Sequence, residues 1–307
     1  MDYQAIVDDA LSTAESYRGH GDVAKHIPAL SGIDPNKLGL ALVLRDGSAF
    51  CAGDADEPFS IQSISTVFTL SLALQQVGGA LWNHVGREAS GSPLNSLVQL
   101  ESDQGKPRNP FVNAGAMVVC DQLIASDTAE AAMEELIAFL RERAGEDDIS
   151  VDERVAMSES KAGDLNRSLA HYVAAFGNLR NPVEAVTSVY FRQCSIAMSC
   201  RQLATAALYL ACDGTDCRTG MAVVSPERAR RINALMLTCG HYDNSGDFAF
   251  RIGLPGKSGS GGGILSIIPG VGAACAWSPG LNAARTSLAG AVALERLVQQ
   301  TGWSIFV

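Results

Sequence analysis

The sequence lacks the charge pattern that nucleic-acid and anionic-membrane binders require. It carries 23 Lys and Arg against 33 Asp and Glu, a formal net charge of -10, and its basic residues are scattered rather than clustered. Binding to a phosphate backbone or to an acidic lipid surface needs a basic patch or stripe. We therefore expect no nucleic-acid partner and no membrane partner, and we expect a small-molecule substrate.

Paired cysteine motifs are also missing. The eight cysteines never form a CxxC pair and lie mostly inside apolar runs, whereas structural zinc sites and small secreted domains use closely spaced cysteines. We predict reduced core cysteines in a cytoplasmic protein. The five histidines have no spacing typical of metal ligands, so no metal site is predicted.

Targeting and membrane segments are not predicted either. Residues 1–19 show no basic region followed by an apolar one and are interpreted as the first helix. The longest uncharged stretch, residues 258–284, is interrupted by glycines and by Pro269 and Pro279. These breaks favour a hairpin over a membrane helix.

Two hairpin patterns stand near the ends of the chain. Residues 38–54, LGLALVLRDGSAFCAGD, place apolar runs around an Asp-Gly turn, and residues 264–278 repeat the pattern around Pro269-Gly270. Between them the periodicity is helical, as in residues 128–145 and 225–240, and a last helix is predicted at 286–302. The apolar segment 199–214 is interpreted as core or subunit contact.

This order of elements predicts an α+β fold in a single domain, residues 1–307. Residues 1–60 and 245–307 would form one antiparallel sheet from the N- and C-terminal hairpins, and residues 61–244 would form an inserted, mainly helical subdomain. A cleft is expected where the two parts meet.

Two short motifs suggest serine chemistry. A serine with a lysine three residues later presents both side chains on one helical turn, where a lysine with a lowered pKa can take the hydroxyl proton. Enzymes of the β-lactamase and penicillin-binding class combine this S-x-x-K with a later K-T-G strand. Here Ser63-Ile64-Ser65-Thr66 follows the first hairpin, and Lys257-Ser258-Gly259 precedes the second. Each motif is weak alone, but their order predicts opposite walls of one cleft.

The chain resembles the serine-dependent glutaminases, which hydrolyse L-glutamine to L-glutamate and ammonia. The resemblance runs from about residue 21 to about residue 303. It is carried by FSIQSIS (59–65), SGSPLNSLVQLESDQGKPRNPFVNAGAM (90–117), SESKAGDLN (158–166), SVYFRQCSI (188–196), CGHYDNSGDFAFRIGLPGKSGSGGGI (239–264) and CAWSPGL (275–281). It implies a β-lactamase/transpeptidase-like fold, no cofactor and a homo-oligomer.

The resemblance also implies a site. Ser63 would be the nucleophile, and the residues that hold glutamine would be Asn113, Glu159, Asn166, Tyr190 and Tyr242. The chemistry of the substrate agrees, because a carboxylate such as Glu159 suits its α-ammonium group and amide or hydroxyl donors suit its α-carboxylate.

Proton transfer and charge stabilisation complete this expected site. Tyr242 matches the tyrosine that shuttles protons near the serine. The backbone N–H groups of Ser63 and Ser260 are the expected oxyanion hole, with Gly259 and Gly261 allowing the backbone to approach closely.

Four positions depart from the family pattern. His26 stands where a tyrosine is expected, Gly256 where alanine is usual, Ser260 in place of valine and Thr66 in place of the lysine. Ser260 should be a mild change because it acts through its backbone. Thr66 is serious, since its hydroxyl is no base at neutral pH and a positioned base contributes about 10² to 10⁴ in rate.

Three functional hypotheses follow. The first is a glutaminase impaired by Thr66, with the alternative for its mechanism that Tyr242, its pKa lowered by Lys257, takes over proton abstraction. The second is a catalytically silent glutamine-binding pseudoenzyme or sensor. The third, a β-lactam-type acyl-enzyme, is disfavoured because the set of Asn113, Glu159 and Asn166 suits a free amino acid better. Taken singly, Ser63 and Thr66 could equally be an ordinary helix N-terminus, and Lys257 a surface charge.

Overall fold

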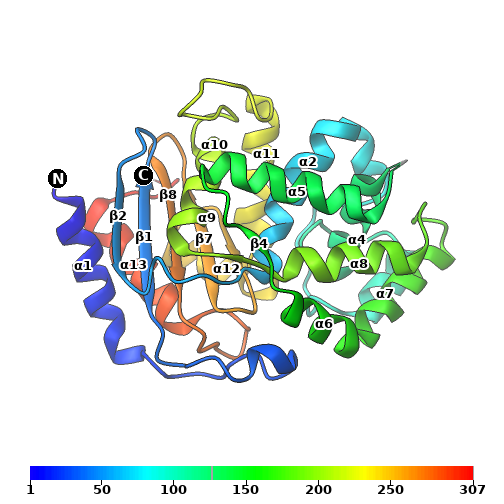
Figure 1. The fold of residues 1–307 in the computed structure, drawn as a ribbon, viewed down its shortest axis with the longest axis horizontal. Coiled ribbons are helices and arrows are strands. Elements are labelled where there is room, and N and C mark those ends of the chain that lie inside the picture. Colours follow the sequence, from blue (N-terminus) through cyan, green and yellow to red (C-terminus); the bar gives the residue numbers. More distant parts are fainter. Residues whose placement is uncertain (126, 307) are drawn as a thin grey trace.

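The structure, a computed structural model, describes residues 1–125 and 127–306 (Figure 1). The strands are β1 (Gly39–Leu44), β2 (Ala49–Gly53), β3 (Phe59–Ser60), β4 (Ser150–Val151), β5 (Ile196–Met198), β6 (Gly256–Ser258), β7 (Gly263–Ile268) and β8 (Gly272–Trp277). The α-helices are α1 (Tyr3–Ala14), α2 (Ser65–Val77), α3 (Leu97–Ser102), α4 (Asn113–Ile124), α5 (Ala129–Ala144), α6 (Glu153–Ala162), α7 (Asp164–Ala175), α8 (Val183–Cys194), α9 (Cys200–Ala206), α10 (Leu208–Ala211), α11 (Pro226–Cys239), α12 (Ser245–Arg251) and α13 (Leu288–Thr301).

One antiparallel sheet joins the two ends of the chain. Its strand order is β2-β1-β8-β7-β6, so the N-terminal hairpin pairs with the C-terminal strands through β1 and β8. A small second sheet, β3-β5-β4, lies among the helices. The predicted α+β fold, with a sheet from two terminal hairpins and a helical insertion, is confirmed.

Both faces of the five-stranded sheet are covered. Along β1, Leu40 and Leu42 pack with α1 and α13, while Ala41 and Val43 pack with the large helical part. Figure 1 shows α1 and α13 on one side of the sheet and most of the other helices on the opposite side. Helix α12 is an exception, because its Phe248 belongs to the same core cluster as α1 and α13. A sheet buried on both faces needs apolar residues at successive positions, which is why these strands read as nearly continuous apolar runs.

The predicted helix ends agree with the caps. Thr128 caps α5 with its side chain, and Gly145 ends it in the left-handed conformation. Ser225 caps α11, with Pro226 at its first position. The last helix begins at Leu288, two residues later than predicted, because Ser287 provides the cap. These caps satisfy terminal N–H groups that have no intrahelical partner.

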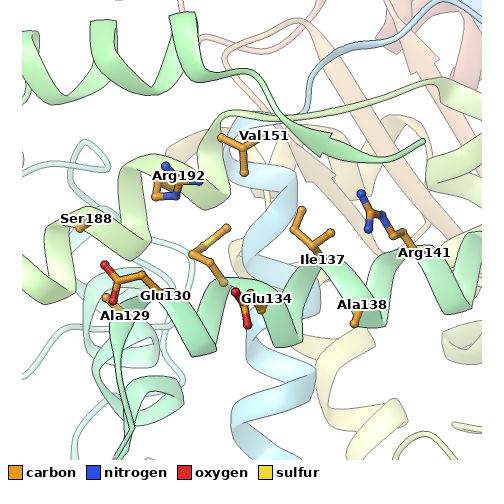
Figure 2. Close-up of a pocket in the computed structure, with 10 residues that line it drawn as sticks. Ala129, Glu130, Glu134, Ile137, Ala138, Arg141, Val151, Ser188 and Arg192 are labelled. Atoms are coloured by element: carbon orange, nitrogen blue, oxygen red, sulfur yellow. The ribbon is translucent and has the colours of Figure 1, made fainter. Parts of the chain in front are cut away.

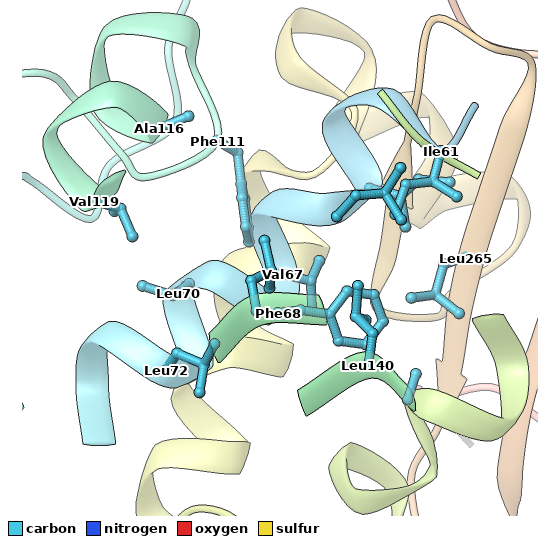
Figure 3. Close-up of a cluster of buried hydrophobic side chains, with 14 of the residues drawn as sticks. Ile61, Val67, Phe68, Leu70, Leu72, Phe111, Ala116, Val119, Leu140 and Leu265 are labelled. Atoms are coloured by element: carbon cyan, nitrogen blue, oxygen red, sulfur yellow. The ribbon is translucent and has the colours of Figure 1, made fainter. Parts of the chain in front are cut away.

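Helix α2 runs through the core of the helical part. Val67, Phe68 and Leu70 are fully buried and pack against Phe111 and Leu140 (Figure 3). With its flanking turns, the helical stretch Gln62–Asn83 is long and apolar enough to cross a membrane, but 67% of its apolar window is buried inside the protein. The packing explains this apolar character as that of a core helix.

One cysteine prediction is wrong. Cys212 and Cys217 form a disulfide in the turn that follows α10, with their Cα atoms 6.3 Å apart. The turn is closed by a hydrogen bond from Thr215 N–H to the Cys212 carbonyl. It brings together two cysteines that are five residues apart and therefore form no CxxC motif. The other six are unpaired, and all but Cys51 are buried.

Candidate active site

A cavity of about 240 Å³ opens between the sheet and the helical part. It is lined by six of the residues selected from the sequence: Ser63, Asn113, Glu159, Asn166, Tyr190 and Ser260. They come from segments up to about two hundred residues apart, so only the fold brings them together. Tyr242, Lys257 and Thr66 lie behind this surface and are buried.

A larger cavity of about 490 Å³ lies elsewhere, between α5 and α8 (Figure 2). Helix α5 contributes Glu130, Glu134, Ile137 and Arg141 to its wall, and α8 contributes Arg192. None of the residues selected from the sequence lines it. Its size therefore does not make it the better candidate, because a site needs converging chemical groups as well as volume.

Close backbone packing positions the serine. Ser63 lies in the short 3-10 helix Gln62–Ile64, just before α2. A β-carbon on Gly259 would lie 2.5 Å from the Ile61 carbonyl oxygen, and one on Gly261 would lie 2.1 Å from that of Ser60. Only glycine permits this approach. The backbone next to Ser260 thus lies against the segment that leads into Ser63, as an oxyanion hole formed by both would require.

Strand β6 directs Lys257 toward the helical side. Lys257 is the cross-strand partner of Leu265, whose side chain belongs to the helical core, and such partners share a face of the sheet. The ammonium group is fully buried and donates to the carbonyls of Ser258 (2.7 Å) and Gly240 (3.1 Å) and to the Tyr242 hydroxyl (3.2 Å). It also lies 4.3 Å from the centre of the Tyr242 ring.

Burial shifts the pKa values of this pair in opposite directions. Removal from water lowers the pKa of Lys257 to about 7, because it disfavours the charged form. It raises the pKa of Tyr242 to about 12, although an interaction with Ser63 acts to lower it. The hypothesis that Lys257 lowers the pKa of Tyr242 is therefore wrong. The group that can accept a proton near neutral pH is therefore the amine of Lys257.

Thr66 is turned toward the helix backbone. Its hydroxyl donates to the Ser63 carbonyl oxygen at 2.7 Å, and its side chain is buried. This is the common i−3 bond of helical threonine. Thr66 and Ser63 thus share a helical turn as predicted, but the threonine proton is engaged with the main chain.

The helical wall supplies one acid and several neutral groups. Asn113 begins α4 and donates its amide N–H to the Asn166 amide oxygen on α7 at 2.8 Å. Glu159 projects from α6 and Tyr190 from α8. Burial raises the pKa of Glu159 to about 7, while a hydrogen bond from Gln62 acts to lower it. An incoming ammonium group would restore the charged carboxylate.

Sequence reasoning missed several residues that line the cavity, among them the polar residues Gln62, His26, Asn95 and Arg285. Gln62 was part of the quoted motif without a role, His26 was noted only as a departure, and Arg285 carried no recognised signal. Gln62, Tyr242 and Arg285 have positive φ values of 51°, 57° and 61°. Backbone strain of this kind concentrates at functional sites, but it is a property of the folded chain and leaves no mark in a single sequence.

The structure explains the glycine at position 256. A β-carbon there would lie 2.5 Å from the Phe248 ring and 2.8 Å from the His241 imidazole. These two rings stack with their centres 3.6 Å apart. The histidine next to Tyr242 therefore occupies the space that an alanine methyl group would need.

Within residues 1–125 and 127–306, no group of three or more His, Cys, Asp or Glu side chains is arranged to hold a metal ion. The cavity and the residues behind it offer a serine, a buried amine and phenol, a carboxylate and amide groups.

Comparison with known proteins gives consistent results. A family model described as Glutaminase matches residues 21–306. A glutaminase from Rhizobium rhizogenes is 55% identical over 305 residues, covering 99% of each chain. A solved structure of a probable glutaminase, ybaS, superposes with a TM-score of 0.92 at 34% identity over 98% of both chains. A probable glutaminase from Bacillus subtilis, solved with 6-diazo-5-oxo-L-norleucine, gives a TM-score of 0.88 at 30% identity, covering 97% of this chain and 94% of its own.

Proposed function

Because the chain belongs to the glutaminase family, we propose that Ser63 hydrolyses the side-chain amide of L-glutamine in the 240 Å³ cavity. Ammonia leaves, a glutamyl ester remains on the serine, and water resolves it to L-glutamate. The observation that carries this proposal is the convergence of Ser63, Glu159 and Asn166 on one cavity. The amino acid solved with the Bacillus subtilis protein supports it, because its name places a side-chain carbonyl at C5, as in glutamine.

Binding would use the two charged ends of the substrate. Glu159 would pair with the α-ammonium group, and the neutral donors of Asn113, Asn166 and Tyr190 would contact the α-carboxylate. The side-chain carbonyl would then face Ser63, with its oxygen toward the N–H groups of Ser63 and Ser260. Such donors stabilise the oxyanion that develops in the tetrahedral intermediate.

Proton transfer would use Lys257 through Tyr242. As Ser63 attacks, its proton passes to the Tyr242 oxygen while the tyrosine proton passes to the Lys257 amine. The phenol therefore never has to become a free phenolate, which its pKa of about 12 would prevent near neutral pH. The resulting ammonium returns a proton through Tyr242 to the leaving nitrogen, and the same route would serve ester hydrolysis. The chain of contacts that supports this runs from Lys257 to Tyr242 at 3.2 Å.

We propose further that Thr66 limits this activity. With its hydroxyl donated to the Ser63 carbonyl, it supplies neither a base nor a positive charge. Ammonia release from L-glutamine by the chain and by its Thr66→Lys variant tests this. We expect the lysine to raise kcat by about 10² to 10⁴, the contribution of a positioned base.

Two further variants sharpen this test. Thr66→Val is the matched control, because it removes only the hydroxyl and should change the rate little. Ser63→Ala should abolish turnover in either background. A chain that is already fast, and that gains nothing from Thr66→Lys, would show that Lys257 and Tyr242 suffice.

A glutamine-binding sensor is the second candidate function. The bond from Thr66 to the Ser63 carbonyl favours it, because the substrate-holding groups are present while the usual base is missing. Calorimetry separates the two functions. Glutamine binding without ammonia release, unchanged by Thr66→Lys, would support the sensor. A response to penicillin but not to glutamine would contradict both.

We also propose a cytoplasmic homo-oligomer. The location is supported by the six cysteines without a disulfide, and the oligomer is implied by the family resemblance. Light scattering on the purified chain gives the number of subunits, and a monomer at working concentration would contradict the proposal. Fractionation of cells that express the chain tests its location.

A further inference from the structure

Arg285 lies on the rim of the cavity in a well-defined turn. The turn joins β8 to α13, and Arg285 donates its backbone N–H to the Asn282 carbonyl at 2.9 Å. Asn282 also bonds Thr286 twice, through its own N–H to the Thr286 carbonyl at 2.9 Å and through its side-chain oxygen to the Thr286 N–H at 3.0 Å. These bonds fix the backbone that places Arg285, an exposed residue, among those that line the cavity.

The guanidinium of Arg285 has no anionic partner among the described residues. No carboxylate there lies within ion-pair distance, 4.0 Å, although most arginines of the chain have one. Its charge acts on the site instead. Burial is the main influence on His26 and on Tyr242, lowering the pKa of the first and raising that of the second, and the Arg285 charge acts to lower both.

The charges that line the cavity are complementary to a free amino acid. Glu159 is the acid among the lining residues, and Arg285 is the permanently charged base. The lowered pKa of His26 favours a neutral imidazole, and Lys257 does not line the cavity. The other candidate donors for a carboxylate are neutral, and Asn113 already gives one amide N–H to Asn166. Hydrogen bonds from a charged donor are roughly twice as strong as neutral ones.

We infer that Arg285 binds the α-carboxylate of the substrate and makes the site selective for side-chain amides of amino acids with a free α-carboxylate. This inference rests on the proposed function, because it requires glutamine to occupy the cavity. Arg285 is then a binding and specificity residue, and it takes no part in proton transfer at Ser63.

The backbone at this position makes a clean test possible. Arg285 has a φ of +61°, in the left-handed region, where a residue with a side chain is strained and glycine is not. Arg285→Gly should therefore fold at least as well as the parent chain. A loss of glutamine binding in this variant would then reflect the missing guanidinium.

The first experiment compares kcat and KM for L-glutamine and for its α-carboxamide, L-glutaminamide, in the parent chain and in Arg285→Gln, Arg285→Gly and Arg285→Lys. We expect the first two variants to raise KM for glutamine about 10- to 100-fold, the equivalent of one charge-assisted hydrogen bond. Their kcat for glutamine and both constants for glutaminamide should stay within about threefold, and Arg285→Lys should recover part of the affinity.

Arg45→Gln is the matched control. Arg45 is exposed in the turn between β1 and β2, at the opposite end of β7 from the cavity, next to Gly270, so this variant should leave all constants unchanged. Equal losses for both substrates in Arg285→Gln and Arg285→Gly, or no loss for either, would overturn the inference.

Calorimetry in the Ser63→Ala background separates this inference from the proposed function. If Ser63→Ala binds glutamine and the added Arg285→Gln weakens binding at least tenfold, the inference is supported. If Ser63→Ala binds glutamine equally well with and without Arg285, the role of Arg285 is wrong while the proposed function stands. If Ser63→Ala binds no glutamine at millimolar concentration, the proposed function fails and the inference fails with it.

Discussion

The protein buries two basic side chains in opposite electrostatic settings. Lys257, with none of its surface exposed, has two carbonyls and a phenol as its partners. Arg143, 5% exposed, faces the equally buried Asp216, with nitrogen and oxygen 2.8 Å apart, and also contacts Glu142. The first lies behind the cavity proposed as the active site, and the second lies under the disulfide turn that carries Asp216.

The difference shows how partners decide what a buried charge does. Burial acts to raise the pKa of Asp216, but the Arg218 N–H and the charge of Arg143 outweigh it and hold that pKa below its usual value. The pair therefore stays charged and ties the turn to α5. No carboxylate within residues 1–125 and 127–306 pairs with Lys257 to compensate its burial, so its pKa falls to about 7. An unpaired buried cation exchanges protons readily, whereas a paired one stabilises a fold only while its partner is present.

Replacing Lys257 should have the largest effect, and it should fall on catalysis. In Lys257→Met we expect ammonia release to drop by about 10² to 10⁴, the contribution of a general base. The free energy of unfolding at pH 7 should not fall, because an apolar side chain of similar volume replaces an uncompensated buried amine. Steady-state rates and chemical denaturation measure the two effects. A comparable loss is expected in Tyr242→Phe, and an unchanged rate there would break the proposed relay.

Replacing Asp216 should lower stability and leave catalysis unchanged. Asp216→Asn leaves Arg143 buried with Glu142 as its remaining acid, so the free energy of unfolding should fall by roughly 3 kcal/mol, the lower end for a broken buried pair. The rate per folded molecule should not change. Asp213→Asn, in the same turn but exposed, is the control and should stay within about 0.5 kcal/mol. If Asp216→Asn altered kcat, the contrast between a catalytic Lys257 and a structural Arg143 would be wrong.

Gly256→Ala tests how tightly the strand that carries Lys257 is held. The new methyl group would overlap the stacked rings of Phe248 and His241, and such overpacking costs about 1 to 3 kcal/mol. Denaturation of Gly256→Ala, Phe248→Leu and the double variant forms a cycle. A coupling energy near zero would mean that the rings do not compete with the methyl group.

The last prediction concerning catalysis is a pH dependence. Both the Lys257 amine and the Glu159 carboxylate have pKa values of about 7 in the empty site, and both act deprotonated. The kcat/KM for glutamine should therefore fall at least tenfold per pH unit below about 6. On kcat only the Lys257 limb should remain, because the bound ammonium group keeps Glu159 ionised. In Glu159→Gln, the pH profile of kcat/KM should show only the titration of Lys257. A kcat of the parent chain that does not change between pH 5 and pH 8 would rule out Lys257 as the base.

The titration of Lys257 should also make the free energy of unfolding depend on pH. The folded-state pKa of Lys257 lies below that of an unfolded lysine, so between about pH 7 and pH 10 the unfolded chain binds the extra proton. This group therefore makes the folded state gain stability as pH rises through that window. Lys257→Met should remove this contribution, whereas Asp216→Asn should not.

Much of the architecture could be read from the chain. Both hairpins, the caps at Thr128 and Ser225 and the end of α13 follow from turn chemistry and helix capping, which depend on neighbours in sequence. The Cys212–Cys217 bridge was missed because a disulfide depends on how a turn folds back. The pKa of Tyr242 was predicted in the wrong direction because burial, which cannot be seen in a list of residues, outweighs the hydrogen bond with Ser63 and the charge of Arg285.

The sequence by itself determined the order of the elements, the apolar faces of the sheet and the set of polar residues that resemble a glutaminase site. These depend on periodicity and on residue type, which the chain carries locally. Only the tertiary structure decided that Lys257 is fully buried with no carboxylate partner among the described residues. It also decided that Thr66 donates to the Ser63 carbonyl and that Arg285 lines the cavity. Each of these depends on distances between segments far apart in the chain, and free energies of burial and charge follow those distances.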